Sequence, residues 1–201
     1  MSPPLGGLPS LLGLLLLMRD VSASMPCGTS AHRILVGNTT RDFLAHTPAA
    51  ACNSNISRAA SAVLVCLHGW RQDSSWACSA MCTPYAEAHG FVALCPQGLT
   101  DQYANTGWNT HDGSGWSAHD DMSFVRAMIS YAHTQAVVPN VTYVTGFSMG
   151  GGLSYRMMCE ASDIISGFSV VAQPGPWGGA GADATAYGAA EGASWARNCT
   201  P

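Results

Sequence analysis

Ser148 stands in the segment Gly146-Phe147-Ser148-Met149-Gly150, which has the spacing Gly-x-Ser-x-Gly. A serine held at a sharp turn between a strand and a helix presents its hydroxyl group as a nucleophile toward a carbonyl carbon. The glycines leave room for the turn, and the free amides at the start of the helix stabilise negative charge on the carbonyl oxygen. The motif therefore predicts acyl transfer with Ser148 as the catalytic nucleophile.

Two backbone amides are candidates for stabilising that charge. One belongs to Met149, directly after the serine, and the other to Trp70, which follows His68-Gly69 at the end of an apolar run. In such sites the second amide comes from the loop after an earlier strand. We therefore expect an oxyanion hole made by the N–H groups of Met149 and Trp70, with the His68 side chain in a structural role.

The serine motif needs a strand before it and a helix after it, and the hydrophobic pattern predicts both, over 141–145 and 150–160. The same alternation extends along the chain. Further strands are predicted over 41–46, 61–67, 91–95 and 168–172, and further helices over 82–89 and from Asp120 or Asp121 onward. Alternating strands and helices indicate parallel strands joined by crossovers. The expected fold class is α/β, with helices on both faces of the sheet.

Composition limits the classes of function. A chain of 201 residues suits one α/β domain, and a formal charge of −4 lacks the basic face of a nucleic-acid-binding protein. All eight cations are arginines, which excludes Schiff-base chemistry on lysine and a P-loop lysine. We expect no cofactor and no metal, because Cys78 and Cys82 lack the second ligand pair of a zinc site.

Residues 1–23 have the pattern of a secretory signal peptide. The apolar run over 8–18 is shorter than the about 20 residues of a membrane-spanning helix, and small residues lead up to a cleavage site near Ala23. Four sequons predict N-glycosylation at Asn38, Asn55, Asn140 and Asn198. The chain is therefore expected to be secreted and extracellular, without a stable membrane anchor.

Eight cysteines follow the predicted cleavage site. An even, high number of cysteines is typical of disulfide-bonded secreted proteins. The pairing stays open at this stage, and the apolar surroundings of Cys66 and Cys95 leave buried free thiols as an alternative.

Several short segments together resemble the secreted polyhydroxybutyrate depolymerase and feruloyl esterase family of α/β-hydrolases. They are 40–44 (TRDFL), 67–69 (LHG), 96–98 (PQG), 107–109 (GWN), 120–124 (DDMSF) and 144–151 (VTGFSMGG). The resemblance covers roughly residues 38–175. It implies an α/β-hydrolase fold and hydrolysis of an ester substrate, such as a polyester or an esterified plant polysaccharide, through an acyl-enzyme on Ser148. Trp108, Asn109 and Trp116 are candidate substrate contacts, with core packing as the alternative for the tryptophans.

The sequence departs from this family after the serine. The catalytic order on the hydrolase fold is serine, acid, histidine, whereas all seven histidines precede Ser148. We therefore expect residues 24–201 to be a partial hydrolase domain with its last strands missing and a Gly/Ala-rich tail or loop over 174–201. The alternatives are a catalytically dead polysaccharide-binding or decoy protein, and peptidase or thioesterase use of the same motif.

Overall fold

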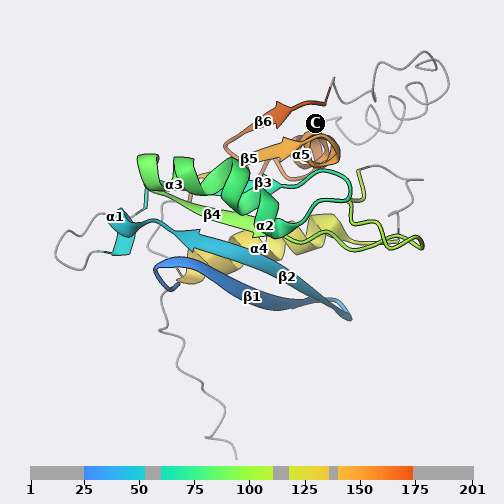
Figure 1. Cartoon of the computed structure of the whole chain (residues 1–201), viewed down its shortest axis with the longest axis horizontal. Helices are drawn as coiled ribbons and strands as arrows, with labels where there is room; N and C mark the ends of the chain where they lie inside the picture. Colours follow the sequence, from blue (N-terminus) through green and yellow to red (C-terminus); the bar gives the residue numbers. More distant parts are fainter. Residues whose placement is uncertain (1–24, 53–59, 111–117, 136–139, 174–201) are drawn as a thin grey trace, which may run out of the picture.

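The computed structural model describes residues 25–52, 60–110, 118–135 and 140–173, and these form one six-stranded sheet (Figure 1). The strands are β1 (Gly28–Val36), β2 (Thr39–Thr47), β3 (Ala62–Leu67), β4 (Phe91–Pro96), β5 (Thr142–Phe147) and β6 (Gly167–Val171). The helices are α1 (Ala49–Cys52), α2 (Ser74–Trp76), the π-helical segment η2 (Ala77–Cys82), α3 (Thr83–His89), α4 (Asp121–Gln135) and α5 (Met149–Glu160). The predicted signal peptide, the 174–201 segment, Trp116, Asn55 and Asn198 lie outside the described residues.

The sheet has the order β1-β2-β4-β3-β5-β6. Strands β4, β3, β5 and β6 run parallel, and Val65 of β3 lies in register with Leu94 of β4 and Val144 of β5. Strand β2 pairs antiparallel with both β4 and β1, so the expected parallel arrangement applies to four strands only. The α/β class is confirmed.

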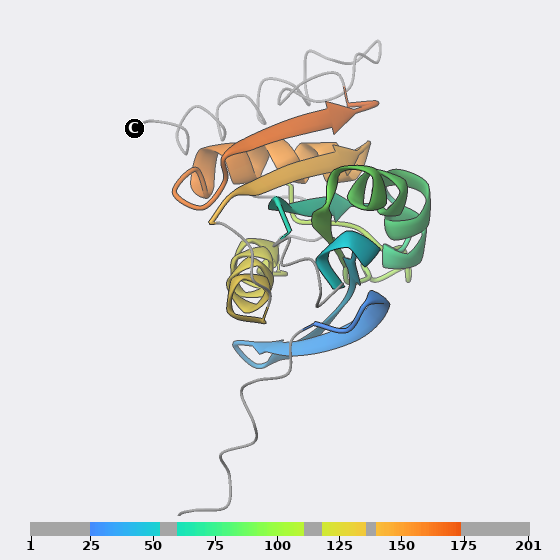
Figure 2. The ribbon, with the colours of Figure 1, turned by 90° about the vertical axis from the view of Figure 1, so that its left-hand side faces the viewer.

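Helices cover both faces of the sheet, as predicted. In Figure 2, α4 and α5 lie on one side of the strands, and the continuous segment formed by α2, η2 and α3 lies on the other. The two faces differ because side chains alternate along a strand. Val63, Val65 and Leu67 of β3 join the aliphatic cluster that includes residues of α4 and α5. Cys66, between two of them, joins a cluster of small residues under η2 and α3.

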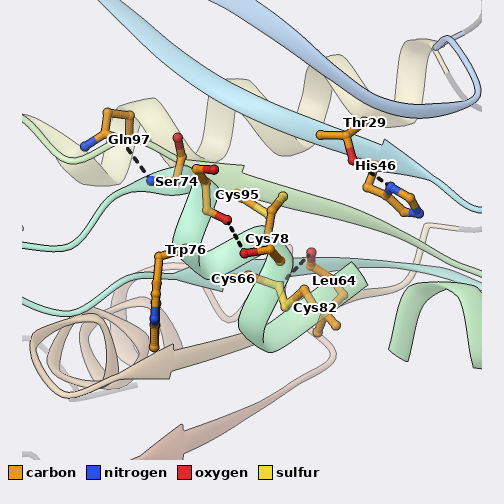
Figure 3. The surroundings of a disulfide bond; sticks show 12 residues. Thr29, His46, Leu64, Cys66, Ser74, Trp76, Cys78, Cys82, Cys95 and Gln97 are labelled. Atoms are coloured by element: carbon orange, nitrogen blue, oxygen red, sulfur yellow. Dashed lines mark hydrogen bonds between the residues drawn. A yellow bond between two sulfur atoms is a disulfide. The ribbon is translucent and has the colours of Figure 1, made fainter. Parts of the chain in front are cut away.

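Disulfide bonds hold the η2 side of the molecule together. Cys82 of η2 is bonded to Cys66 of β3, and Cys78 is bonded to Cys95 of β4 (Figure 3). A third bond joins Cys27 to Cys52. The prediction of disulfides is confirmed, and the alternative of free thiols at Cys66 and Cys95 is wrong. The bonds compensate for the small alanine and cysteine side chains that pack here.

Strand β1 was not predicted, because its sequence, GTSAHRILV, mixes polar and apolar residues. It forms a hairpin with β2, turning at Gly37 and Asn38, and Gly37 has a φ of 57° that favours glycine. Asn38 and Asn140 are both exposed, so their predicted glycosylation is sterically feasible. Within the described ranges, every helix is too short or too polar to cross a bilayer.

Candidate active site

Ser148 lies at the sharp turn between β5 and α5. Strand β5 continues to Phe147 and the helix starts at Met149, so the serine is the single residue between them. Its backbone has a φ of 51° and a ψ of −116°, a conformation that costs a residue with a side chain about 1–3 kcal/mol. The Ser148 N–H donates to the carbonyl of Val171 at 2.8 Å. The end of β6 therefore helps to hold Ser148 in its strained conformation.

The two glycines of the motif are required by contacts with backbone atoms. A Cβ atom on Gly146 would lie 2.6 Å from the nitrogen of Gly151 and closer still to Gly150 O. A Cβ atom on Gly150 would lie 2.6 Å from the carbonyl oxygen of His68, and closer to that of Leu67. Helix α5 thus begins directly against the end of β3. No larger residue fits at either position without moving the backbone.

The same close approach brings the two predicted oxyanion-hole amides to one end of the sheet. Trp70 lies two residues after the His68 carbonyl that borders the start of α5, and a Cβ atom added to Gly69 would lie 3.0 Å from the ring of Phe147. The first amides of a helix have no partner within the helix, which leaves Met149 N–H available. An oxyanion hole made by Met149 and Trp70 stays a prediction.

The His68 side chain is fully buried and takes part in the structure. Its Nε2 accepts the N–H of Gly98 at 3.0 Å, so its Nδ1 carries the hydrogen and donates to Gly69 O at 2.7 Å. Burial lowers the pKa of this imidazole below its ordinary value. A neutral, fully hydrogen-bonded ring fits the structural role expected for His68.

A buried ion pair supports the loops at this end of the sheet, and the sequence did not reveal it. Arg41 of β2 donates to Asp121 Oδ1 of α4 at 2.6 Å, with both side chains at most 2% exposed. The other carboxylate oxygen, Oδ2, accepts the backbone N–H of Asn109 at 2.6 Å. The Arg41 guanidinium also stacks 4.0 Å above the ring of Phe124. One carboxylate therefore connects β2, α4 and the loop that contains Asn109.

The neighbouring residues Asp120 and Asp121 have different structural roles. Asp120 Oδ1 accepts the backbone N–H of Ser123 at 2.9 Å at the start of α4, as a helix-capping side chain does. The hydrogen bonds from the side chain and the backbone of Ser123 lower the pKa of Asp120. Asp121 carries the buried ion pair. The sequence predicted a helix starting at Asp120 or Asp121, but it did not reveal the buried ion pair of Asp121.

The predicted substrate contacts occupy different environments. Trp108 is fully buried, and its indole N–H donates to His68 O at 2.8 Å, so it packs in the core, which was the alternative for this residue. Asn109 is 6% exposed, and its side-chain amide donates to His119 O at 3.0 Å. These surroundings favour structural roles for Trp108 and Asn109. Trp116 lies outside the described residues.

Among the described residues, no histidine hydrogen-bonds to the Ser148 side chain. His32 bonds to Ser30 and Tyr131, His46 to Thr29 and Glu87, His119 to Thr100, and His133 to Thr142. His68 is buried as described above, and His89 contacts the rings of Tyr85 and Phe91. Within the described ranges, the predicted nucleophile Ser148 therefore has no histidine as a hydrogen-bond partner.

Comparison with known proteins adds independent findings. No family model matches the chain. A curated poly(3-hydroxybutyrate) depolymerase from Ralstonia pickettii is 30% identical over 94 residues, which are 45% of this chain and 19% of that protein. The chain thus matches less than a fifth of the length of this curated relative.

Solved structures match a larger part of the chain. The fluorophosphonate-binding serine hydrolase F of Staphylococcus aureus superimposes with a TM-score of 0.55 at 16% identity, covering 74% of this chain and 59% of that one. A ferulic acid esterase superimposes with a TM-score of 0.52 at 15% identity, covering 85% of this chain and 69% of that one. The chain has the α/β-hydrolase fold. In this hydrolase fold, Ser148 occupies the turn after β5, where the sequence pattern places the nucleophile.

The resemblance predicted from short segments is also confirmed, because a polyhydroxybutyrate depolymerase and a ferulic acid esterase both appear among the similar proteins. At these identities, the solved structures establish the fold of the chain.

Proposed function

We propose that this chain is a secreted serine hydrolase that cleaves carboxylic esters through an acyl-enzyme on Ser148. The strained backbone of Ser148 is the observation that supports it most directly. A serine with a φ of 51° at a strand-to-helix turn has no evident structural purpose, because glycine would occupy the same conformation without strain. Retaining serine at this position is what a nucleophile requires.

The proposed reaction has two steps. Ser148 Oγ attacks the ester carbonyl carbon, its proton passes through a general base to the departing alcohol, and the carbon–oxygen bond to that alcohol breaks. Water then attacks the acyl-enzyme, releasing the carboxylic acid and restoring the serine hydroxyl. Met149 and Trp70 N–H groups hold the oxyanion in both steps. We place the general base outside the described residues, because none of their histidines hydrogen-bonds to Ser148.

Secretion is part of the proposal and has its own support. Three disulfide bonds are formed among the described residues, and such bonds persist in oxidising compartments. The depolymerase and esterase relatives suggest polyesters or feruloylated plant polysaccharides as the substrates to try first.

The test uses a fluorophosphonate probe, which reacts covalently with activated serines, together with hydrolysis of 4-nitrophenyl acetate and methyl ferulate. We expect the probe to label the Ser148 peptide and Ser148→Ala to abolish both labelling and hydrolysis. The matched control is Ser162→Ala, at an exposed serine beyond α5, which should leave both unchanged. Hydrolysis that survives Ser148→Ala would overturn the mechanism.

A non-catalytic binding protein is the second candidate, and the engagement of the described histidines elsewhere favours it. The exposed Trp70, with 51% of its surface accessible, provides an aromatic face on which a sugar ring can stack. Retention on xylan or cellulose, lost in Trp70→Ala and accompanied by no hydrolysis of either ester, would support this function over the first.

A further inference from the structure

Arg71 is a cation with no carboxylate partner in the described part of the chain. The other described arginines are all paired: Arg33 with Asp42, Arg41 with Asp121, Arg126 with Asp163 and Arg156 with Glu160. The nearest acidic residue in sequence, Asp73, accepts the N–H of Trp76 at 2.7 Å as the cap of α2. An exposed cation without a carboxylate partner creates a locally positive potential. This potential contrasts with the formal charge of −4 on the whole chain.

The backbone of Arg71 is held in a strained turn. Gln72 N–H donates to Gly69 O at 3.2 Å and closes the turn, and the side-chain oxygen of Gln72 accepts Gly69 N–H at 2.8 Å. Arg71 N–H donates to Thr106 O at 2.9 Å. The φ of Arg71 is 61°, a value that suits glycine at this turn position. A non-glycine residue that keeps such a conformation points to a role for its side chain.

The guanidinium of Arg71 lies over the ring of Trp70, 5.4 Å from the ring centre. Stacking on a tryptophan face orients the planar guanidinium and reduces the freedom that it loses on binding. Because Arg71 is exposed, N–H groups that the ring does not cover are available to a ligand. The edge of a guanidinium matches the two oxygens of a carboxylate.

This turn lies beside the nucleophile. Gly69, at its start, packs against the ring and carbonyl of Phe147 at 3.0 and 3.3 Å from its added Cβ position, and Phe147 immediately precedes Ser148. Trp70, whose amide is assigned to the oxyanion hole, is the residue before Arg71. Arg71 therefore directly follows, in sequence, one of the two amides assigned to the oxyanion hole.

We propose that Arg71 binds a carboxylate on the substrate, so that the site prefers esters carrying a free carboxylate close to the scissile bond. This role rests on the ester hydrolysis proposed above. Half-esters of dicarboxylic acids and short oligomers of hydroxy acids have this chemistry. A neutral ester binds the same nucleophile and oxyanion hole but leaves Arg71 unused.

The first experiment compares two methyl esters of similar shape, monomethyl succinate and methyl 4-methylpentanoate, by methanol release. The carboxylate of the first is replaced by an isopropyl group in the second. We expect Arg71→Gln to lower kcat/KM for monomethyl succinate about tenfold, the range of one charge-assisted hydrogen bond, with the neutral ester within about twofold. Arg71→Lys should restore part of the loss, because it keeps the charge but not the planar fork.

The matched control is Arg33→Gln, which removes an exposed arginine on the β1–β2 hairpin that is already paired with Asp42. It should leave kcat/KM for both esters unchanged. If Arg71→Gln lowers both rates equally, or neither, the carboxylate preference is wrong while ester hydrolysis by Ser148 stands.

A second measurement does not depend on turnover. Calorimetric titration of both esters into Ser148→Ala and into Ser148→Ala/Arg71→Gln measures binding alone. We expect the added Arg71 substitution to weaken the binding of monomethyl succinate about tenfold and to leave the binding of methyl 4-methylpentanoate nearly unchanged. If the unsubstituted chain hydrolyses neither ester, this binding result would leave the carboxylate site in place and overturn only the catalytic proposal. Equal affinities in the two variants would overturn the site.

Discussion

The Ser148 turn and the Arg41–Asp121 ion pair support the same end of the sheet by opposite means. The turn is built from residues close in sequence, and its shape depends on backbone contacts that leave no room for a Cβ atom at Gly146 or Gly150. The ion pair joins residues 80 positions apart, and its stability depends on buried charge. The first region is therefore sensitive to size, and the second is sensitive to charge. Substitutions that change one property at a time can separate the two.

The largest effect is expected from Asp121→Asn, which removes one charge while keeping the shape of the side chain. Arg41 would stay buried with an uncompensated charge, and its Nε has no hydrogen-bond partner among the described residues even in the intact protein. Breaking a buried ion pair in this way costs about 3–5 kcal/mol. Urea unfolding should show this loss, whereas Asp42→Asn, in the exposed pair with Arg33, should change the midpoint little. Similar midpoints for the two variants would contradict the importance of buried charge.

Gly150→Ala tests the sensitivity of the serine turn to size. The added methyl group would collide with the carbonyl oxygens of Leu67 and His68, so the free energy of unfolding should fall by about 3 kcal/mol. The control is Gly90→Ala. Gly90 has a φ of 74° but nothing within 4 Å of an added Cβ, so only the strain of about 1–2 kcal/mol remains. A Gly150→Ala protein as stable as the control would show that the backbone yields easily.

Ser148 itself provides a smaller and opposite effect. Ser148→Gly relieves the strained backbone and Ser148→Ala keeps it, so the glycine variant should be the more stable of the two by about 1 kcal/mol. Thermal or urea unfolding of the pair gives the difference directly. If the alanine variant is the more stable, the turn imposes no strain on the nucleophile.

The smallest expected effect is a gradual dependence of the free energy of unfolding on pH. One of the groups responsible, His68, lies beside the serine turn. The His68 carbonyl borders Gly150, and its ring binds Gly98 N–H. Burial lowers the pKa values of His68, His32 and His133 from the ordinary 6.5. Near and below pH 6.5 the unfolded chain therefore binds more protons than the folded one. The free energy of unfolding is highest above that pH and declines as pH falls through and below it.

Urea midpoints between pH 8 and pH 5 measure this decline, and ring NMR signals report the protonation of each histidine. The His68 ring should titrate below the ordinary pKa of 6.5 in the folded protein. Titration at or above that value would contradict the role of burial.

Local patterns were predictable from the sequence, and long-range polar contacts were not. Strands β3 to β6 were found from apolar runs, and the serine turn from five consecutive residues, because both signals lie within one short window. Strand β1 was missed because only one of its faces packs inward and polar residues interrupt that face. The ion pair between Arg41 and Asp121 required knowing that Arg41 of β2 reaches the first residue of α4.

Residue type alone also left roles ambiguous. Trp108 was a candidate substrate contact and Trp70 a candidate oxyanion-hole residue, yet the side chain of the first is fully buried and that of the second is half exposed. The Trp108 indole donates to His68 O, a contact across 40 residues that no local pattern reveals. Arg71 received no assignment because an isolated arginine gives no signal until its neighbours are known.

The two disulfide bonds around η2 overlap along the chain, since Cys78 lies inside the loop closed by Cys66 and Cys82, and Cys95 lies outside it. A protease that cut the exposed bond between Ser79 and Ala80 would therefore release nothing. Both bridges would still connect the two pieces, one through β3 and the other through β4. A single cut anywhere from Cys66 to Cys95 leaves at least one bridge across it, so the nicked protein remains one covalent molecule.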